Sequence, residues 1–371
     1  MSEENLPTPT PTPHKRRKRY PGKNPRRFED KYKEHGGDDA TIEKVLASGK
    51  TPAGTHRSIM VAEILQVLAP KPGDLAVDCT LGFGGHAREI LGKILPGGKL
   101  IGLDQDPVEL PKTEARLRAL GFDATVLVTH RSNFAGLPQV LAAHLGAPAS
   151  VPAGDPDKTS PARMPALPAA ADLILADLGV SSMQIDDPTR GFSVKFNGPL
   201  DMRMNPQRGQ PAAVWLQKIS PSALAEMLAD SADEPNAARL APVLAGKPFA
   251  TTLALAGAVR AALPRLGRED SDLTVRRVFQ ALRIAVNDEF SALDAFLRNL
   301  PACLKPRGRV AILTFHSGED RRVKKAFAAG LRDGLYSDIA QEVMRPTPEE
   351  IRSNNRAAPA KLRWAVKTPS S

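Results

Sequence analysis

Short apolar runs alternate with amphipathic stretches over the first half of the chain. Residues 75–77, 99–103, 124–128 and 172–176 are apolar runs with the length of buried strands. The stretches between these runs have apolar positions at helical spacing, at residues 87–91, 106–120 and 133–145. This alternation predicts a largely parallel α/β sheet with helices on both faces, the Rossmann-like class.

The pattern changes after the fourth run. Residues 211–285 contain several helical patterns and no convincing strand. Residues 279–297 have the spacing of one long amphipathic helix that leads back to the sheet. Residues 310–315 then form a strong strand pattern, and Ser317 with Asp320 is typical of a capping box that opens the next helix.

These changes predict the domain organisation. Residues 1–54 are rich in Pro, Thr and basic side chains, and we expect a disordered arm. Residues 55–184 and 286–371 would form the sheet domain, with a Pro- and Ala-rich loop insertion at 147–171. Residues 185–285 would be an inserted helical domain that recognises the substrate.

A glycine-rich turn follows the first predicted strand. Asp78 ends that strand, and Gly82, Gly84 and Gly85 precede the next helical pattern. Glycine lets a ligand approach the backbone, and the free N–H groups of a helix N-terminus attract anions. The spacing fits neither G-x-G-x-x-G nor a P-loop. The turn therefore either holds a nucleotide-like ligand or only connects strand to helix.

The amino-acid composition limits the kinds of binding partner and the cellular compartment that we expect. The 371 residues have a net charge of +10, which favours a polyanion, whereas an aromatic content of 5% disfavours base-stacking platforms. No apolar run is long enough for a membrane span, and there is no secretory signal pattern. The two cysteines, Cys79 and Cys303, provide no disulfide framework, so we expect a cytoplasmic protein.

Two acidic residues end other predicted strands. Asp104 ends the second strand, about where a ribose-binding carboxylate is expected in this type of sheet. A helix-capping role for Asp104 is less favoured, because Asp106 is better placed to cap the following helix. Asp177 ends the fourth strand and begins a loop dense in Asp, Arg and Gly, where its carboxylate can accept hydrogen bonds from an amine. The alternatives are a capping residue for Asp104 and a turn residue for Asp177.

Other residue groups support weaker hypotheses. His316, Ser317 and Asp320 lie on one short turn without a nucleophile elbow, which disfavours a hydrolase. His86 and His130 lack further residues at metal-ligand spacing, so no metal site is expected.

Five segments together are similar to the RsmH (MraW) family of S-adenosylmethionine-dependent rRNA methyltransferases. The likeness runs in order from about residue 56 to residue 366. The segments that carry it are Asp-Cys-Thr-Leu-Gly-Phe-Gly-Gly-His (78–86), Asp-Leu-Gly-Val-Ser-Ser (177–182), Gly-Pro-Leu-Asp-Met-Arg-Met (198–204), Phe-Gln-Ala-Leu-Arg-Ile-Ala-Val-Asn (279–287) and Phe-His-Ser-Gly-Glu-Asp (315–320).

The resemblance implies a class I methyltransferase fold and methylation of the exocyclic N4 of cytosine 1402 in 16S rRNA, within the small ribosomal subunit. S-adenosyl-L-methionine would be the cofactor. The residues that the resemblance places in the cofactor pocket are Gly84, Gly85 and His86 at the methionine end, Asp104 at the ribose, and Phe134, Asp177 and Gln184 around the remainder.

The reaction class suggests direct transfer of the methyl group to the amine, with Asp177 as the acceptor that orients the amine and removes a proton. Two other functions stay open. One is a non-catalytic RNA-binding assembly factor that retains the fold, and the other is an amino-methyltransferase with another nucleic-acid target. The sequence does not indicate an oligomeric state.

Overall fold

The computed structural model describes residues 58–145 and 170–370. The predicted basic arm at 1–54 and nearly all of the predicted loop insertion at 147–171 lie outside these ranges. Within the described part, no helix is long and apolar enough to cross a bilayer.

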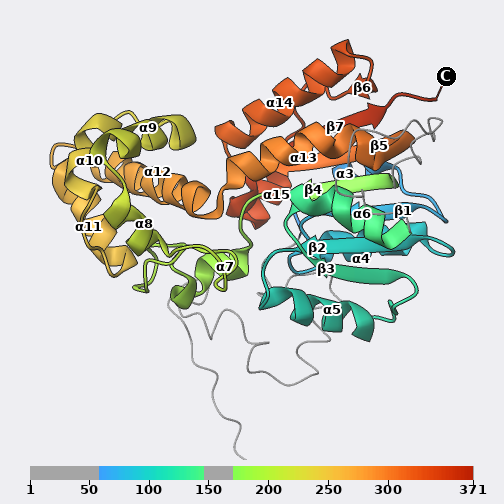
Figure 1. Cartoon of the computed structure of the whole chain (residues 1–371), viewed down its shortest axis with the longest axis horizontal. Coiled ribbons are helices and arrows are strands. Elements are labelled where there is room, and N and C mark those ends of the chain that lie inside the picture. Colours follow the sequence, from blue (N-terminus) through green and yellow to red (C-terminus); the bar gives the residue numbers. More distant parts are fainter. Residues whose placement is uncertain (1–57, 146–169, 371) are drawn as a thin grey trace, which may run out of the picture.

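A seven-stranded sheet forms the centre of the larger half of the molecule (Figure 1). Its order is β3-β2-β1-β4-β5-β7-β6; the first five strands are parallel, and β7 is antiparallel to both β5 and β6. The strands are β1 (Leu75–Asp78), β2 (Lys99–Asp104), β3 (Leu127–Arg131), β4 (Ala171–Asp177), β5 (Leu304–Thr314), β6 (Tyr336–Ile339) and β7 (Lys361–Lys367). The predicted doubly wound α/β class is confirmed.

Helices cover both faces of the sheet. Successive residues of a strand point to opposite faces, and here both faces carry apolar side chains that pack against helices. In β1, Ala76 packs into one apolar core and Val77 into the other. The first core takes residues from α3 (Val61–Leu68), α4 (Gly85–Ile94) and α5 (Glu109–Ala119). The second takes residues from α6 (Leu137–Leu145), α13 (Glu289–Cys303) and α14 (Ser317–Arg332).

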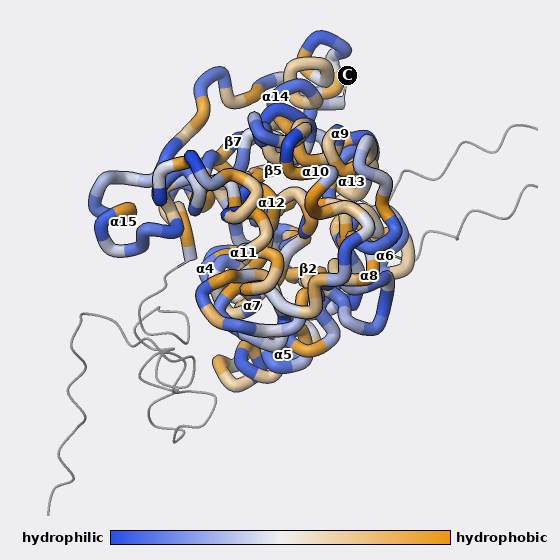
Figure 2. Tube along the Cα trace, turned by 90° about the vertical axis from the view of Figure 1, so that its left-hand side faces the viewer, coloured by the Kyte–Doolittle hydropathy of each residue, from blue (hydrophilic) through white to orange (hydrophobic). Residues whose placement is uncertain are grey.

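A third apolar core lies within the helices on the left of Figure 1. These helices are α8 (Ala212–Lys218), α9 (Pro221–Ala232), α10 (Ala237–Leu244), α11 (Thr252–Ala262) and α12 (Arg268–Asn287). In Figure 2, which looks onto these helices, α11 and α12 carry hydrophobic stretches, whereas the segment around α15 (Pro348–Ser353) is largely hydrophilic and lies at the edge of the view. The helices predicted at 211–285 are therefore present and have a core of their own.

The third strand begins later than the sequence pattern predicts. Residues 124–128 carry the apolar run, but β3 spans Leu127–Arg131. Asp123 explains the shift, because its carboxylate accepts the backbone N–H of Thr125 at 2.8 Å and its carbonyl accepts the N–H of Leu127 at 3.0 Å. This local turn uses residues that would otherwise extend the strand.

The predicted single helix at 279–297 is wrong. The chain forms α12 and α13, separated by Asp288 with a φ angle of 50° in the left-handed region. Both helices bury their apolar stripes, so the hydrophobic period continues across the break and conceals it.

Two strands were not predicted, β6 and β7. The pattern in β7 is obscured by charged residues, of which Arg363 is buried and pairs with Asp320 at 2.6 Å. Other boundaries moved by a few residues: α5 begins at Glu109, a short 3-10 turn η2 (Phe134–Gly136) precedes α6, and β5 begins at Leu304.

Asp288 offers a test of the helix break, because its side chain is exposed and makes no cap hydrogen bond. We expect Asp288→Val to lower the free energy of unfolding by about 1–2 kcal/mol, the cost of a left-handed backbone at a residue with a Cβ. The cost is larger for Val than for Asp, because a β-branched side chain adopts this backbone conformation less readily. Asp288→Gly should be neutral or stabilising. Urea denaturation of the two variants measures this, and equal stability would contradict the strained turn.

Candidate active site

A cavity of about 850 Å³ lies at the carboxyl ends of the parallel strands. The strand order reverses between β1 and β4, since β2 follows on one side and β5 on the other. Such a reversal opens a crevice above the sheet where ligands of doubly wound folds bind. All seven residues proposed for the cofactor pocket line this cavity: Gly84, Gly85, His86, Asp104, Phe134, Asp177 and Gln184.

The glycine turn forms one wall of the cavity and leads directly into α4. Gly84 has a φ of 85°, and a Cβ there would lie 2.9 Å from the Thr113 side chain. A Cβ at Gly85 would collide with the hydroxyl of Ser58. Both glycines line the cavity, so the bare backbone at the N-terminus of α4 borders it directly.

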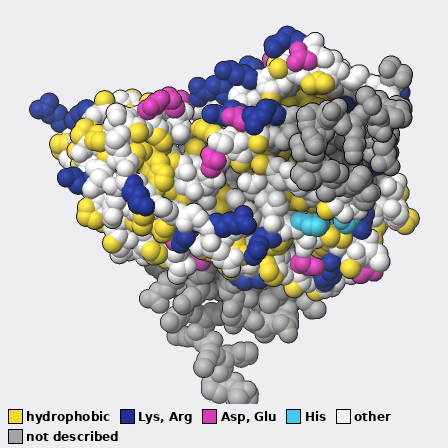
Figure 3. Space-filling model, viewed as in Figure 1, with side chains coloured by type: hydrophobic (Ala, Val, Ile, Leu, Met, Phe, Trp, Pro, Cys, Tyr) yellow, Lys and Arg dark blue, Asp and Glu magenta, His cyan; other side chains and the backbone are white. Residues whose placement is uncertain are grey.

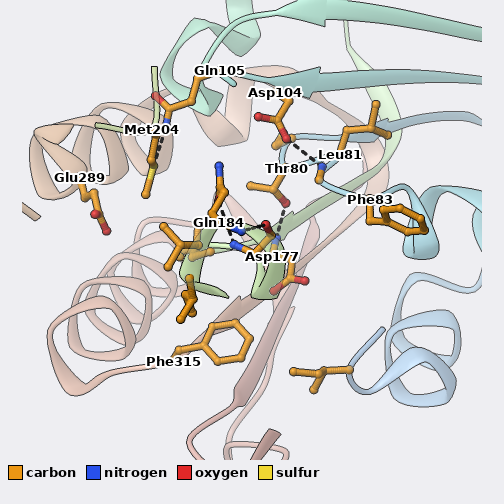
Figure 4. Close-up of a pocket in the computed structure, with 18 of the residues that line it drawn as sticks. Thr80, Leu81, Phe83, Asp104, Gln105, Asp177, Gln184, Met204, Glu289 and Phe315 are labelled. Carbon is orange, nitrogen blue, oxygen red and sulfur yellow. Dashed lines mark hydrogen bonds between the residues drawn. The ribbon is translucent and has the colours of Figure 1, made fainter. Parts of the chain in front are cut away.

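Asp104 is fixed at the end of β2 by two backbone bonds. Its Oδ2 accepts the N–H of Gly82 at 2.8 Å, and its Oδ1 accepts the N–H of Asp106 at 2.8 Å. Burial raises the pKa of the Asp104 carboxyl to about 6. These two bonds hold the carboxylate in place at the cavity (Figure 4). Each oxygen keeps a further lone pair, so the carboxylate can still accept hydrogen bonds from the hydroxyl groups of a ligand.

Asp177 lies at the end of β4, and its neighbours are also ionisable. Its backbone N–H donates to Thr80 Oγ1 at 2.6 Å, and its Oδ2 lies 3.5 Å from Nε2 of the buried His86. Burial opposes a charge on this imidazole, but Asp177 and Asp78 outweigh burial and raise the pKa of His86. Burial also raises the pKa of Asp78 to about 6.

Phe134 and Gln184 complete the part of the cavity that the sequence indicated. The Phe134 ring packs edge-on against Phe296, with centroids 5.5 Å apart. Gln184 closes a capping box at the start of α7 (Ser182–Asp186), and its Nε2 donates to Asp106 Oδ2 at 2.8 Å. Its side-chain amide is therefore tied to both the loop after β4 and the loop after β2.

Asp106 has a second role that the sequence did not reveal. The predicted N-cap role is wrong, because Val108 is the N-cap of α5, but one Asp106 carboxylate oxygen accepts the N–H groups of Val108 and Glu109 in the turn that leads into the helix. The other lies 2.8 Å from Arg190 Nη1 in a pair that is almost fully buried. Only the fold could show this, because the partners are 84 positions apart.

Arg190 continues the connection into the loop that precedes the helical region. Its Nη2 donates to the carbonyl oxygens of Arg203 and Met204 at 3.2 and 2.9 Å. From the other side, Asn287 accepts the Met204 N–H at 2.7 Å and donates to the Met202 carbonyl at 2.8 Å. The 202–204 segment is thus held at the cavity by Arg190 on one side and by the end of α12 on the other.

A charged cluster on the far side of the cavity was also missed. Arg283 and Glu289 form a two-pronged ion pair, and Glu319 lies close to His316. The predicted capping box of Ser317 and Asp320 is wrong: His316 is the N-cap of α14, and its Nδ1 accepts the Glu319 N–H. Asp320 instead pairs with basic side chains of β7.

Comparison with known proteins identifies the family. The family model described as "MraW methylase family" matches residues 53–368. The chain belongs to the MraW methylase family. The expected resemblance is therefore confirmed, and the protein is a methyltransferase.

Curated relatives agree with this assignment. "Ribosomal RNA small subunit methyltransferase H 1" of Agathobacter rectalis is 44% identical over 99% of this chain and 99% of its own length. "Ribosomal RNA small subunit methyltransferase H 2" of Alkaliphilus metalliredigens is 45% identical over 95% of this chain and 97% of its own. Among solved structures, an S-adenosylmethionine-dependent O-methyltransferase of Thermotoga maritima aligns with 89% of this chain and 72% of its own length. Its sequence identity is 10% and its TM-score is 0.37, and no argument rests on it.

S-adenosyl-L-methionine is the cofactor of this methyltransferase family, and the cavity fits it in chemistry. The side-chain-free backbone at Gly84 and Gly85 lies at a helix N-terminus, which suits a carboxylate. The anchored carboxylate of Asp104 suits vicinal hydroxyls, and the cluster of acidic groups around His86 suits a cation.

The raised pKa of Asp104 gives a pH-dependent prediction. A protonated Asp104 would replace an acceptor by a donor, so the affinity for S-adenosylhomocysteine should fall about tenfold from pH 7 to pH 5, as expected for a pKa of about 6. Isothermal titration calorimetry measures this. Asp104→Asn should bind more weakly at pH 7 and lose most of the pH dependence; an unchanged profile in this variant would assign the titration to other groups.

The buried pair of Asp106 and Arg190 gives a prediction about stability. Arg190→Met leaves the Asp106 carboxylate buried without its counter-charge, so the free energy of unfolding should fall by about 3–5 kcal/mol. Adding Asp106→Asn removes the uncompensated charge and should restore part of the loss. Chemical denaturation of the single and double variants tests this, and a double variant no more stable than Arg190→Met would argue against the pair.

Proposed function

We propose that this protein transfers the methyl group of S-adenosyl-L-methionine to the exocyclic N4 of a cytosine in small-subunit ribosomal RNA. By resemblance, the target is cytosine 1402 of 16S rRNA. The family match and the names of the full-length relatives support ribosomal RNA as the substrate. The observation that carries the chemistry is Asp177, a carboxylate at the end of β4 in the same cavity as the glycine turn.

Asp177 would act on the amine. The lone pair of a cytosine amine is delocalised into the ring, so the amine needs an acceptor that orients it toward the methyl group. As the new N–C bond forms and the C–S bond breaks, N4 becomes positively charged and must lose a proton. Asp177 accepts the hydrogen bond and then the proton, and His86, 3.5 Å behind it, stabilises the carboxylate.

The other cavity residues would bind the cofactor. Gly84, Gly85 and His86 hold its methionine end, and Asp104 accepts the ribose hydroxyls. Phe134 and Gln184 complete the enclosure. With both reactants held in line, positioning alone lowers the barrier by several kcal/mol.

We assign RNA recognition to residues 185–285, which would act as an inserted domain next to the sheet domain of 55–184 and 286–371. Arg276, on α12, is exposed and lines the cavity, where it can contact a phosphate. Figure 3 shows Lys and Arg side chains near the middle of the face, between the helices and the sheet domain. The net charge of +10 supports a polyanionic partner, and a ribosomal substrate would place the enzyme in the cytoplasm.

Asp177→Asn tests this function. The variant keeps the size of the side chain but removes its charge, so single-turnover methylation of unmethylated small subunits should slow by about 10²-fold or more. Cofactor affinity should change less than in Asp104→Ala. Asp172→Asn, at the other end of β4, is the matched control. Mass spectrometry of the nucleosides identifies the methylated position.

Each contrary result has a definite meaning. Full turnover in Asp177→Asn would reject its catalytic role, and equal losses of rate and cofactor affinity would make it a binding residue. A folded, cofactor-binding wild type that methylates no ribosomal RNA would favour an assembly factor. Transfer to another nucleic acid would indicate a different target.

A further inference from the structure

The charged cluster opposite the glycine turn has no role in the reaction as described so far. Arg283, Glu289 and Glu319 line the same cavity as Asp177. In Figure 4, Glu289 lies across the cavity from Phe83 and Asp104, which mark the cofactor side. The cluster comes from segments that are far apart in the sequence, the α12–α13 junction and the start of α14.

The Arg283–Glu289 pair is rigid and largely removed from solvent. Nε and Nη2 of Arg283 donate to the two Glu289 oxygens at 2.7 and 2.8 Å, and the side chains are 15% and 11% exposed. This arrangement uses one edge of each group. The outer lone pairs of the carboxylate and the remaining guanidinium N–H groups stay available, so the pair presents an acceptor beside a donor.

Glu319 is held equally firmly. Its Oε2 accepts the Phe315 N–H at 2.8 Å, and its Oε1 lies 3.2 Å from His316 Nε2. The His316 side chain is 9% exposed, and its Nε2 has no hydrogen bond of good geometry. Because Nδ1 accepts a backbone N–H, the proton is on Nε2, so Nε2 faces the Glu319 carboxylate as a donor.

A cation is a poor occupant for this cluster, although Glu289, His316 and Glu319 have ligand atoms within 4.8 Å of one another. Arg283 already neutralises Glu289 through both of its oxygens. A protonated Nε2 cannot coordinate a metal. The cluster is better suited to a neutral ligand that has both donors and acceptors.

We propose that Arg283, Glu289 and Glu319 form the wall that receives the Watson–Crick edge of the target base and selects cytosine over uracil, with His316 as a positioning residue for Glu319. This inference rests on the proposed function. The ring of the base must extend away from the cofactor once its amine reaches Asp177, and Glu289, which Arg283 holds, lies on the side away from Phe83 of the glycine turn.

The selection follows from the pattern of donors and acceptors. Cytosine has an amine donor next to two acceptors, N3 and O2, and carboxylates accept from its N4. The guanidinium can donate to the ring acceptors. Uracil has a carbonyl oxygen in place of the amine, so the carboxylates would face a second acceptor without a hydrogen between them. A site of this kind rejects the mismatched analogue strongly.

The test measures discrimination separately from activity. Small subunits that carry uracil at the target position are used as competitive inhibitors of methylation of cytosine subunits. The wild type should bind the cytosine subunits at least tenfold more tightly than the uracil subunits. Glu289→Gln exposes an amide donor, so this ratio should fall at least threefold while the affinity for S-adenosylhomocysteine stays the same.

Two further variants make the result decisive. Asp294→Asn breaks the exposed α13–α14 ion pair with Arg322 outside the cavity and should leave the ratio unchanged. If Glu289→Gln fails to fold, the double variant Arg283→Met with Glu289→Met removes both charges together and should also lose the discrimination.

The outcomes separate this proposal from the proposed function. A wild-type ratio near one, or an unchanged ratio in folded Glu289 variants with reduced turnover, would overturn the selection role and leave the methyltransferase assignment intact. A wild type that methylates no cytosine would instead overturn the proposed function itself.

Discussion

The reversal of strand order between β1 and β4 determines where the cavity and the carboxylates at the strand ends lie. Because β1, β2 and β4 are parallel neighbours, their last residues, Asp78, Asp104 and Asp177, end at one edge of the sheet. The reversal then keeps helices from covering that edge, which leaves the cavity open above it. The crowding of carboxylates there is a consequence of topology, and burial turns it into raised pKa values at Asp78 and Asp104.

The second determinant is the contact between the sheet domain and the helical region. Each has its own apolar core, so apolar packing alone does not fix the relation between them. A directional polar contact does so: Arg190 pairs with Asp106 after β2 and also bonds the carbonyls of the 203–204 segment, which Asn287 at the end of α12 bonds in turn. These bonds hold the 202–204 segment at the cavity, which Met204 lines.

The sequence was most informative where signals are local. Periodicity predicted the parallel strands, and the residues at strand ends, Asp104 and Asp177, were found because parallel strands share one edge. It was least informative where structure depends on distant partners. The charged residues of β7 suggest a polar segment and not a strand, since only the fold shows that Asp320 neutralises Arg363. Asp106 reads as a cap, and the α12–α13 break is hidden by a continuous apolar period.

The Arg190–Asp106 bond also limits how the molecule can be rebuilt. Arg190 and the 202–204 segment lie within residues 185–285, whereas Asp106 and Asn287 lie outside this range. A chimaera that exchanged residues 185–285 between two relatives would therefore transfer one half of each link and keep the other. Such an exchange works only between chains whose residues at these positions match, because a few polar bonds couple the exchanged segment to the rest of the molecule.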